Sequence, residues 1–139
     1  MFEPVVIKCV KAGAVLKLFN PEWDTRKKTL ESFVVTLESK EFSATRRVYA
    51  NMSEHFVTFF EKMANDWKGW EGEKTAESLE HDFQLSANCD SLGHVSLKVI
   101  LRQTSVPNGW RLEAALMLEA GQLDSVADQV HRFWTYPGK

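Results

Sequence analysis

Apolar and polar residues alternate along much of the chain, with the period of two that is typical of β-strands. The first half holds four such stretches, and we expect strands at residues 5–10, 14–19, 32–38 and 42–49. Gly13 lies in the short gap between the first two stretches, which favours a hairpin. Asn20-Pro21 is expected to end the second strand and to open a polar loop.

Arg46 interrupts the alternation in the fourth stretch. It shares its parity with Phe42, Ala44 and Val48, so a regular strand would point an arginine toward the core. A β-bulge would instead reset the register. In either case Arg46 is a candidate partner for a buried carboxylate, because a buried charge needs a compensating one.

A helical period replaces the alternation after residue 52. Large apolar side chains recur there at helical spacing, at Phe56, Phe59, Phe60, Met63 and Trp67. Ser53 is expected to cap the N-terminus of this helix through its hydroxyl group. Gly69 is expected to end it, because glycine adopts the left-handed conformation at little cost. The pattern predicts a helix over residues 53–68.

The second half returns to alternation, and we expect a meander of antiparallel strands at residues 79–87, 94–102 and 110–118. Matching the apolar faces predicts that Leu97 lies opposite both Phe83 and Ala114. The other face would then carry a row of Asp82, Lys98 and Glu113, which is typical of a solvated surface. A second helix is expected from Gln122 to about Trp134.

These elements predict an α+β fold with the order four strands, helix, three strands, helix. We expect one curved antiparallel sheet of about seven strands, with both helices packed on its apolar face. The 139 residues match the size of one domain, and no repeat, low-complexity tract or linker divides them. Residues 1–139 are therefore interpreted as a single globular domain.

Charge limits the classes of partner. The formal net charge of −2 gives no basic surplus for binding nucleic acid. Residues 61–90 alone are acidic, with eight acidic and three basic side chains, and suit either a solvated loop or a partner with a basic surface. The pattern shows no leader and no run of about eighteen apolar residues. We therefore expect no membrane association and a cytoplasmic location.

Residues 65–74, NDWKGWEGEK, concentrate tryptophans and acidic residues. One interpretation is structural, with Trp70 sealing the end of the helix after Gly69. However, the carboxylates lie at the helix C-terminus, where the helix dipole disfavours negative charge. The second interpretation is therefore a binding site, in which indole anchors have an acidic rim. Its candidate residues are Asp66, Trp67, Trp70, Glu71 and Glu73.

Asp90 and His94 lie four residues apart across a glycine-containing turn. The pair suits a general base or half of a metal site, and equally an aspartate that stabilises the turn. Two side chains fall short of a zinc site, so no metal is predicted. His81 shares a strand face with apolar residues and is interpreted as a core histidine. Cys9 and Cys89 lack CxxC spacing, and no catalytic residue or cofactor is predicted.

Three segments are distinctive in combination: W-x-G-W at Trp67–Trp70 with the acidic residues after it, D-x-x-G-H-V at Asp90–Val95, and E-A-G-Q-L at Glu119–Leu123. With these segments, residues 48–130 resemble a bacterial family of uncharacterised proteins, domain of unknown function 6228. The resemblance implies a single compact bacterial domain. It implies no activity, ligand or catalytic residue.

Three functional hypotheses follow from the sequence. The first is a non-catalytic protein-binding module, for instance an immunity-type protein that neutralises a toxin, because aromatic anchors and complementary charge make tight interfaces. The second is a small-molecule-binding protein or enzyme with a tryptophan-lined cleft. Its candidate residues are Arg46, Trp67, Trp70, Asp90, His94 and Trp110. The third is a homodimer formed through an edge strand or the last helix. We favour the first.

Overall fold

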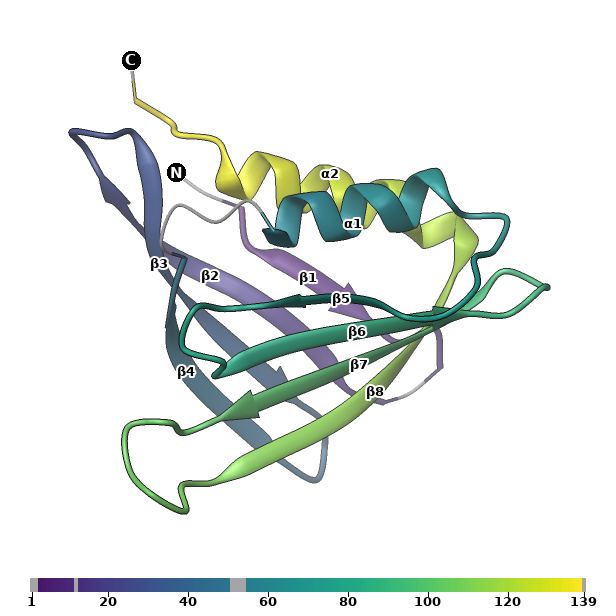
Figure 1. Cartoon of the computed structure of the whole chain (residues 1–139), viewed down its shortest axis with the longest axis horizontal. Helices are drawn as coiled ribbons and strands as arrows, with labels where there is room; N and C mark the ends of the chain where they lie inside the picture. Colours follow the sequence, from purple (N-terminus) through teal and green to yellow (C-terminus); the bar gives the residue numbers. More distant parts are fainter. Residues whose placement is uncertain (1–2, 12, 51–54, 139) are drawn as a thin grey trace.

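The computed structural model describes residues 3–11, 13–50 and 55–138 as an α+β fold of two antiparallel four-stranded sheets and two helices (Figure 1). Sheet A contains, in spatial order, β1 (Val5–Lys8), β2 (Val15–Asp24), β3 (Thr29–Glu38) and β4 (Ser43–Tyr49). Sheet B contains β5 (Lys74–Glu77), β6 (Phe83–Cys89), β7 (His94–Arg102) and β8 (Arg111–Glu119). The helices are α1 (His55–Asn65) and α2 (Ala120–Trp134).

The expected single sheet of about seven strands is wrong, because the strands divide into two sheets. The strand missing from the sequence prediction is β5, which pairs with β6. Its sequence, KTAE, has no alternation of large apolar side chains, so the pattern gave no sign of it. The edges of the two sheets meet where the backbone N–H of Val10 donates to the carbonyl oxygen of Met117 at 2.9 Å.

The register of sheet B also differs from the expected one. Phe83 lies opposite Leu101 rather than Leu97, and Leu97 lies opposite Leu116 rather than Ala114. Both shifts are even, so each side chain keeps its face of the sheet. The apolar face is therefore buried as expected. The expected row of Asp82, Lys98 and Glu113 does not form.

β2 continues through the segment predicted to be a loop. Its register is irregular between Phe19 and Glu22, so residues 20–21 form a bulge, which is one of the few places where a strand accepts proline. Beyond the bulge the ladder resumes, with Trp23 opposite Leu30. Because Pro21 sits in the irregularity, the strand reaches five residues farther than its predicted last residue, Phe19, to Asp24.

The two helices lie side by side over the sheets and share one core with both of them (Figure 1). Phe33 of β3, Phe56 of α1, Phe83 of β6 and Phe133 of α2 are each no more than 2% exposed. The ring of Phe33 lies 6.0 to 6.5 Å from the other three rings. Phe56 stacks on Phe83 at 5.0 Å, which confirms the predicted packing of the phenylalanine-rich helix on the second set of strands.

The helix ends differ slightly from the predicted ones. α1 ends at Asn65, and residues 66–68 form a turn. The expected N-cap of this helix, Ser53, lies outside the described residues. α2 begins at Ala120, two residues before the predicted start. The side-chain oxygen of Gln122 accepts the backbone N–H of Glu119 at 2.8 Å, which is one half of a capping box.

Candidate functional site

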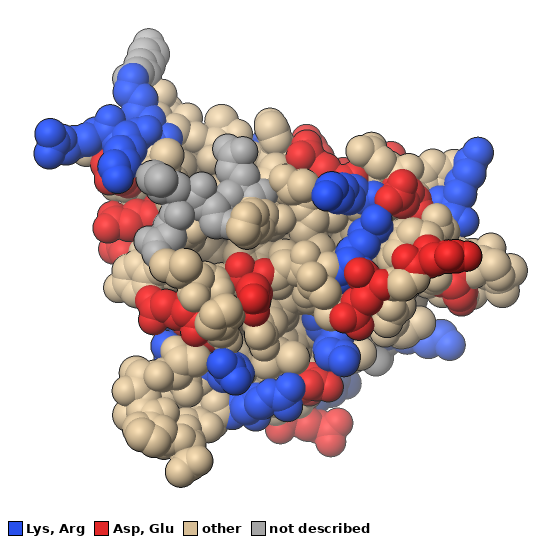
Figure 2. All heavy atoms as spheres, in the orientation of Figure 1, with Lys and Arg blue, Asp and Glu red and all other residues tan. Residues whose placement is uncertain are grey.

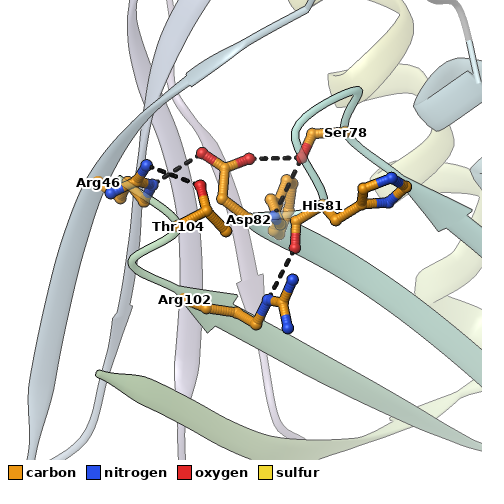
Figure 3. Close-up of polar contacts among 7 residues, drawn as sticks. Arg46, Ser78, His81, Asp82, Arg102 and Thr104 are labelled. Atoms are coloured by element: carbon orange, nitrogen blue, oxygen red, sulfur yellow. Dashed lines mark hydrogen bonds and ion pairs between the residues drawn. The ribbon is translucent and has the colours of Figure 1, made fainter. Parts of the chain in front are cut away.

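A buried ion pair joins the two sheets where β6 begins (Figure 3). Arg46 of β4 donates from Nε to Oδ2 of Asp82 at 2.7 Å and from Nη2 to Oγ1 of Thr104 at 3.3 Å. Asp82 is 1% exposed, and the Ser78 hydroxyl donates to its Oδ1 at 2.5 Å. We call Arg46, Ser78, Asp82 and Thr104 the clamp. The prediction that Arg46 pairs with a buried carboxylate is confirmed.

The location of Asp82 on a solvated face, as the sequence predicts it, is wrong. β6 begins at Phe83 rather than at residue 79, and His81 has a positive φ of 60°. The chain therefore turns at His81, and the alternation does not extend back to Asp82. The core location of His81 is wrong as well, because its side chain is 58% exposed and its Nδ1 lies 2.9 Å from Oε2 of Glu77.

The polar groups of the clamp bond to one another and to the backbone nearby. The Ser78 hydroxyl oxygen accepts the backbone N–H of Phe83 at 3.1 Å. The ring of His81 points away from Ser78 (Figure 3), toward Glu77, so it does not supply the adjacent base that activates a serine nucleophile. We interpret the clamp as a fixed link between sheet A and sheet B.

Trp70 lies at the other end of sheet B and is part of the fold. Its Nε1 donates to the carbonyl oxygen of Ala87 at 3.3 Å, and its side chain packs against the core. Gly69 has a φ of 125° and donates its N–H to the carbonyl oxygen of Asp66, so it closes the turn that follows α1, whereas the helix itself ends at Asn65, before the predicted stop. Lys74 lies 2.7 Å from the Asp66 carboxylate and 4.9 Å from the Trp70 ring. The carboxylate at the helix C-terminus is therefore compensated by Lys74.

Trp67 behaves differently, since it is 50% exposed. The Nζ of Lys68 lies 5.4 Å from the centre of its ring, within the range of a cation–π contact. Glu71 and Glu73, which follow it in the sequence, are exposed. The structural interpretation of this segment accounts for Trp70 and leaves the Trp67 side chain without a role in the core.

Asp90 stabilises the turn between β6 and β7. Its Oδ1 accepts the backbone N–H groups of Leu92 at 2.8 Å and His94 at 2.9 Å, and its Oδ2 lies 3.1 Å from Nδ1 of His94. The hydrogen bond from the backbone N–H of His94 contributes most to lowering the pKa of Asp90 below its usual value. The N–H of Leu92 and the His94 ring lower this pKa further. The turn presents Leu92 at 79% exposure.

The segment around Trp67 and the Asp90 turn pack against each other. A Cβ atom at Gly69 would lie 3.4 Å from the carbonyl oxygen of Asp90. A Cβ atom at Gly93 would lie 3.8 Å from the carbonyl oxygen of Trp67 and 3.5 Å from Cβ of Ala120. The three segments that are distinctive in the sequence thus meet at one end of the molecule. We call residues 66–73, 90–94 and 119–122 the motif end.

Two of the predicted site residues lie elsewhere. Arg46 belongs to the clamp, and Trp110 lies at the hairpin between β7 and β8, where it is 40% exposed. Asp82 and Asp90 flank β6, so about 25 Å of extended chain separates the clamp from the motif end. The tryptophan-lined cleft proposed from Arg46, Asp90 and Trp110 is therefore not assembled. Leu92 carries no sequence signal of its own, since a single leucine in a turn fits no period.

The two cysteines are free thiols in the structure. Cys9 Sγ accepts the backbone N–H of Met117 at 3.3 Å, and Cys89 Sγ donates to the carbonyl oxygen of Asp90 at 3.4 Å. Burial raises the pKa of the Cys89 thiol, and the Asp90 carboxylate raises it further. Cys89 is thus held in the protonated form, which is a poor nucleophile.

In residues 3–11, 13–50 and 55–138, no three side chains of His, Cys, Asp or Glu are grouped as ligands of a metal ion. Neither α1 nor α2, the helices of that part of the chain, is long and apolar enough to cross a bilayer.

Comparison with protein families identifies a family whose model matches this chain. The model of a family of unknown function (DUF6228) covers residues 8–137, which is most of the chain, and the protein belongs to this family. The matched range is wider than residues 48–130, on which the resemblance in the sequence was based. Searches of curated proteins and of solved structures find no match.

Proposed function

We propose that this member of DUF6228 is a non-catalytic protein-binding module, and that its motif end docks a partner protein with a basic surface. An immunity-type protein, which neutralises a toxin by binding it, is one instance of such a module. The single observation that carries the proposal is the contrast between Trp70 and Trp67. The fold uses the first for its core, whereas the second is 50% exposed.

The exposed apolar groups at the motif end suit a protein interface. Leu92, at 79% exposure, lies in the turn that packs against the Trp67 backbone through Gly93. A half-exposed tryptophan and an exposed aliphatic side chain, on two segments whose backbones are in contact, have the composition of an interface hot spot, where desolvation of large side chains supplies most of the affinity. The glycine packing also fixes the two segments relative to each other, which lowers the entropic cost of binding.

The charge of the motif end selects the partner. Lys74 neutralises Asp66, but Glu71, Glu73, Asp90 and Glu119 outnumber the remaining lysine, Lys68. On the face seen in Figure 2, acidic and basic side chains are interspersed toward the right-hand end, where Figure 1 shows the connections α1–β5 and β6–β7. An acidic surplus steers a basic surface toward the site and repels an acidic one.

Capture of the partner from the native cells tests the proposal. The tagged full chain is used as bait, and the retained protein is then purified and its affinity measured for the wild type and for Trp67→Ala. We expect binding to weaken about 30-fold or more, which is the loss typical of a hot-spot residue. Raising the salt concentration should weaken the wild-type complex, because part of the attraction is electrostatic.

Trp110→Ala is the matched control. Trp110 is also a partly exposed tryptophan, at 40%, but it lies at the clamp end of sheet B. Its loss should leave partner binding unchanged, and both variants should keep the thermal unfolding temperature of the wild type within a few degrees. Equal binding by Trp67→Ala and wild type, or retention of no stoichiometric partner, would contradict the proposal.

A further inference from the structure

The edge of sheet A at β1 is closed by side chains of the last helix. In an antiparallel pair, every second residue directs its backbone groups away from the neighbouring strand. The outward N–H of Val6 donates to Oε1 of Gln129 at 3.0 Å, and the outward carbonyl oxygen of Lys8 accepts Nε2 of Gln122 at 3.0 Å. Helix α2 therefore takes the place of a neighbouring strand along β1.

At the opposite edge of sheet A, no strand of the described residues pairs with the outer side of β4. Ser39 donates its N–H to Phe42 and Ala50 donates its N–H to Glu31, so the even-numbered residues of this strand bond to β3. The outward backbone groups belong to Ser43, Thr45, Arg47 and Tyr49. Among the described residues, no hydrogen bond reaches these outward groups.

We propose that β4 pairs with β4 of a second copy of this chain, antiparallel and centred on Thr45. The two A sheets would then continue into each other across a two-fold axis. The edge is open to solvent, because Ser43 and Thr45 are exposed and Tyr49 is 46% exposed. An open strand edge of this length is a template for another strand.

The sequence of β4 is complementary to itself in this register. Ser43 lies opposite the partner's Arg47, Ala44 lies opposite the partner's Arg46, and Thr45 lies opposite the partner's Thr45. A small residue thus faces each arginine, and a threonine pair, which is favourable across strands, lies on the axis. Moving the centre to residue 46 or 47 would set identical arginines opposite each other, which is destabilising.

Charge favours a second copy over an acidic foreign strand as the occupant. Arg46 is paired with Asp82, and Arg47 lies 3.2 Å from Glu22 of its own sheet. The edge therefore carries little uncompensated charge with which to select an acidic strand. A binding strand must pair with the outward backbone donors and acceptors of β4 and must match its pattern of small and large side chains. A second copy of β4 does both.

Sedimentation of the purified full chain over a wide range of concentrations tests the proposal, with a reversible dimer as the expected result. Ser43→Glu should raise the association constant, because the new carboxylate faces the partner's Arg47, and Ser43→Arg should lower it. Two equivalent charge pairs form across the axis, so each change should be about 2- to 30-fold. Ser43 is exposed, so both variants should keep the wild-type fold.

Thr45→Pro and Ala115→Pro form a matched pair. Both positions lie on outer strands with their backbone groups directed away from the sheet, Ala115 on β8. Only Thr45→Pro should dissociate the dimer, because proline removes an outward donor on β4. The proposal is overturned by a monomer at every concentration, by effects of equal sign from the two Ser43 variants, or by dissociation in Ala115→Pro alone.

Discussion

The clamp and the motif end lie at opposite ends of β6, and each contains a carboxylate. At the clamp, Asp82 is 1% exposed and both of its oxygens are bonded, by Arg46 and Ser78. At the motif end, the bonds of Asp90 serve its own turn, and the neighbouring Leu92 is 79% exposed. Saturated, buried polar groups hold a fold together, whereas exposed large side chains on a rigid turn are available to a partner.

Of the substitutions that test this difference between the clamp and the motif end, those at the clamp should change the free energy of unfolding most. Asp82→Ala would leave the Arg46 guanidinium largely buried without its partner, at 18% side-chain exposure, and should lower the free energy of unfolding by about 3 to 5 kcal/mol. Urea unfolding measures this change. Arg46→Met combined with Asp82→Leu should restore part of the stability, because no charge is then buried. A loss below about 1 kcal/mol from Asp82→Ala would show that the clamp does not hold the sheets.

A smaller effect is expected at the glycines of the motif end. Gly93 has a φ of 82°, which L-residues rarely adopt, so Gly93→Ala should destabilise by about 1 to 2 kcal/mol through backbone strain. Gly121, the residue after Ala120 in α2, has open space around its Cβ position and no positive φ. Gly121→Ala should therefore stabilise by up to about 1 kcal/mol. Thermal unfolding compares the sign of the stability change in the two variants. A Gly93→Ala protein as stable as the wild type would contradict the positive φ of the Asp90 turn.

The smallest effect concerns pH. Since hydrogen bonds hold the folded-state pKa of Asp90 below the usual 3.8, its stabilisation is complete above that pH and is lost as the pH falls through the folded-state value. Unfolding free energies of the wild type should therefore fall more steeply in acid than those of Asp90→Asn, which cannot titrate there. Urea unfolding at a series of pH values on both sides of 3.8 measures the two slopes. If the unfolding free energies of the two proteins fell equally steeply with pH, the Asp90 carboxylate would not stabilise the turn.

The sequence predicted correctly which face of a strand a side chain lies on, because odd and even positions of a strand face opposite sides of the sheet. Arg46 could be matched to a buried carboxylate because parity alone points it at the core. The faces of sheet B survived an incorrect register for the same reason, since Leu97 keeps its face under any even shift. Elements without a period were not predictable. β5 has no apolar alternation, and the extension of β2 passes through Pro21, which normally ends a strand.

The composition of the candidate site followed from the sequence, but its assembly did not. The indoles and the acidic residues could be read from residues 65–74, and the aspartate turn from Asp90 and Gly93. The helical spacing, however, placed Trp67 on the apolar stripe of the helix, whereas it lies beyond α1 and is 50% exposed. The meeting of the two segments depends on the close approach of Gly69 and Gly93 to backbone carbonyl groups, a tertiary contact that no local spacing encodes. For the same reason Arg46 was grouped with side chains that lie at the far end of β6.

The two glutamines that close β1 link the beginning of the fold to its last helix, and the bond from Val6 to Gln129 spans 123 positions. During translation, the first strand therefore emerges from the ribosome long before the side chains that cover it exist. Until then its backbone groups are open to any other strand, including those of neighbouring nascent chains. The last of the side chains that protect this strand is thus synthesised 123 positions after the residue that it covers, and chaperones that shield exposed strands would matter most in that interval.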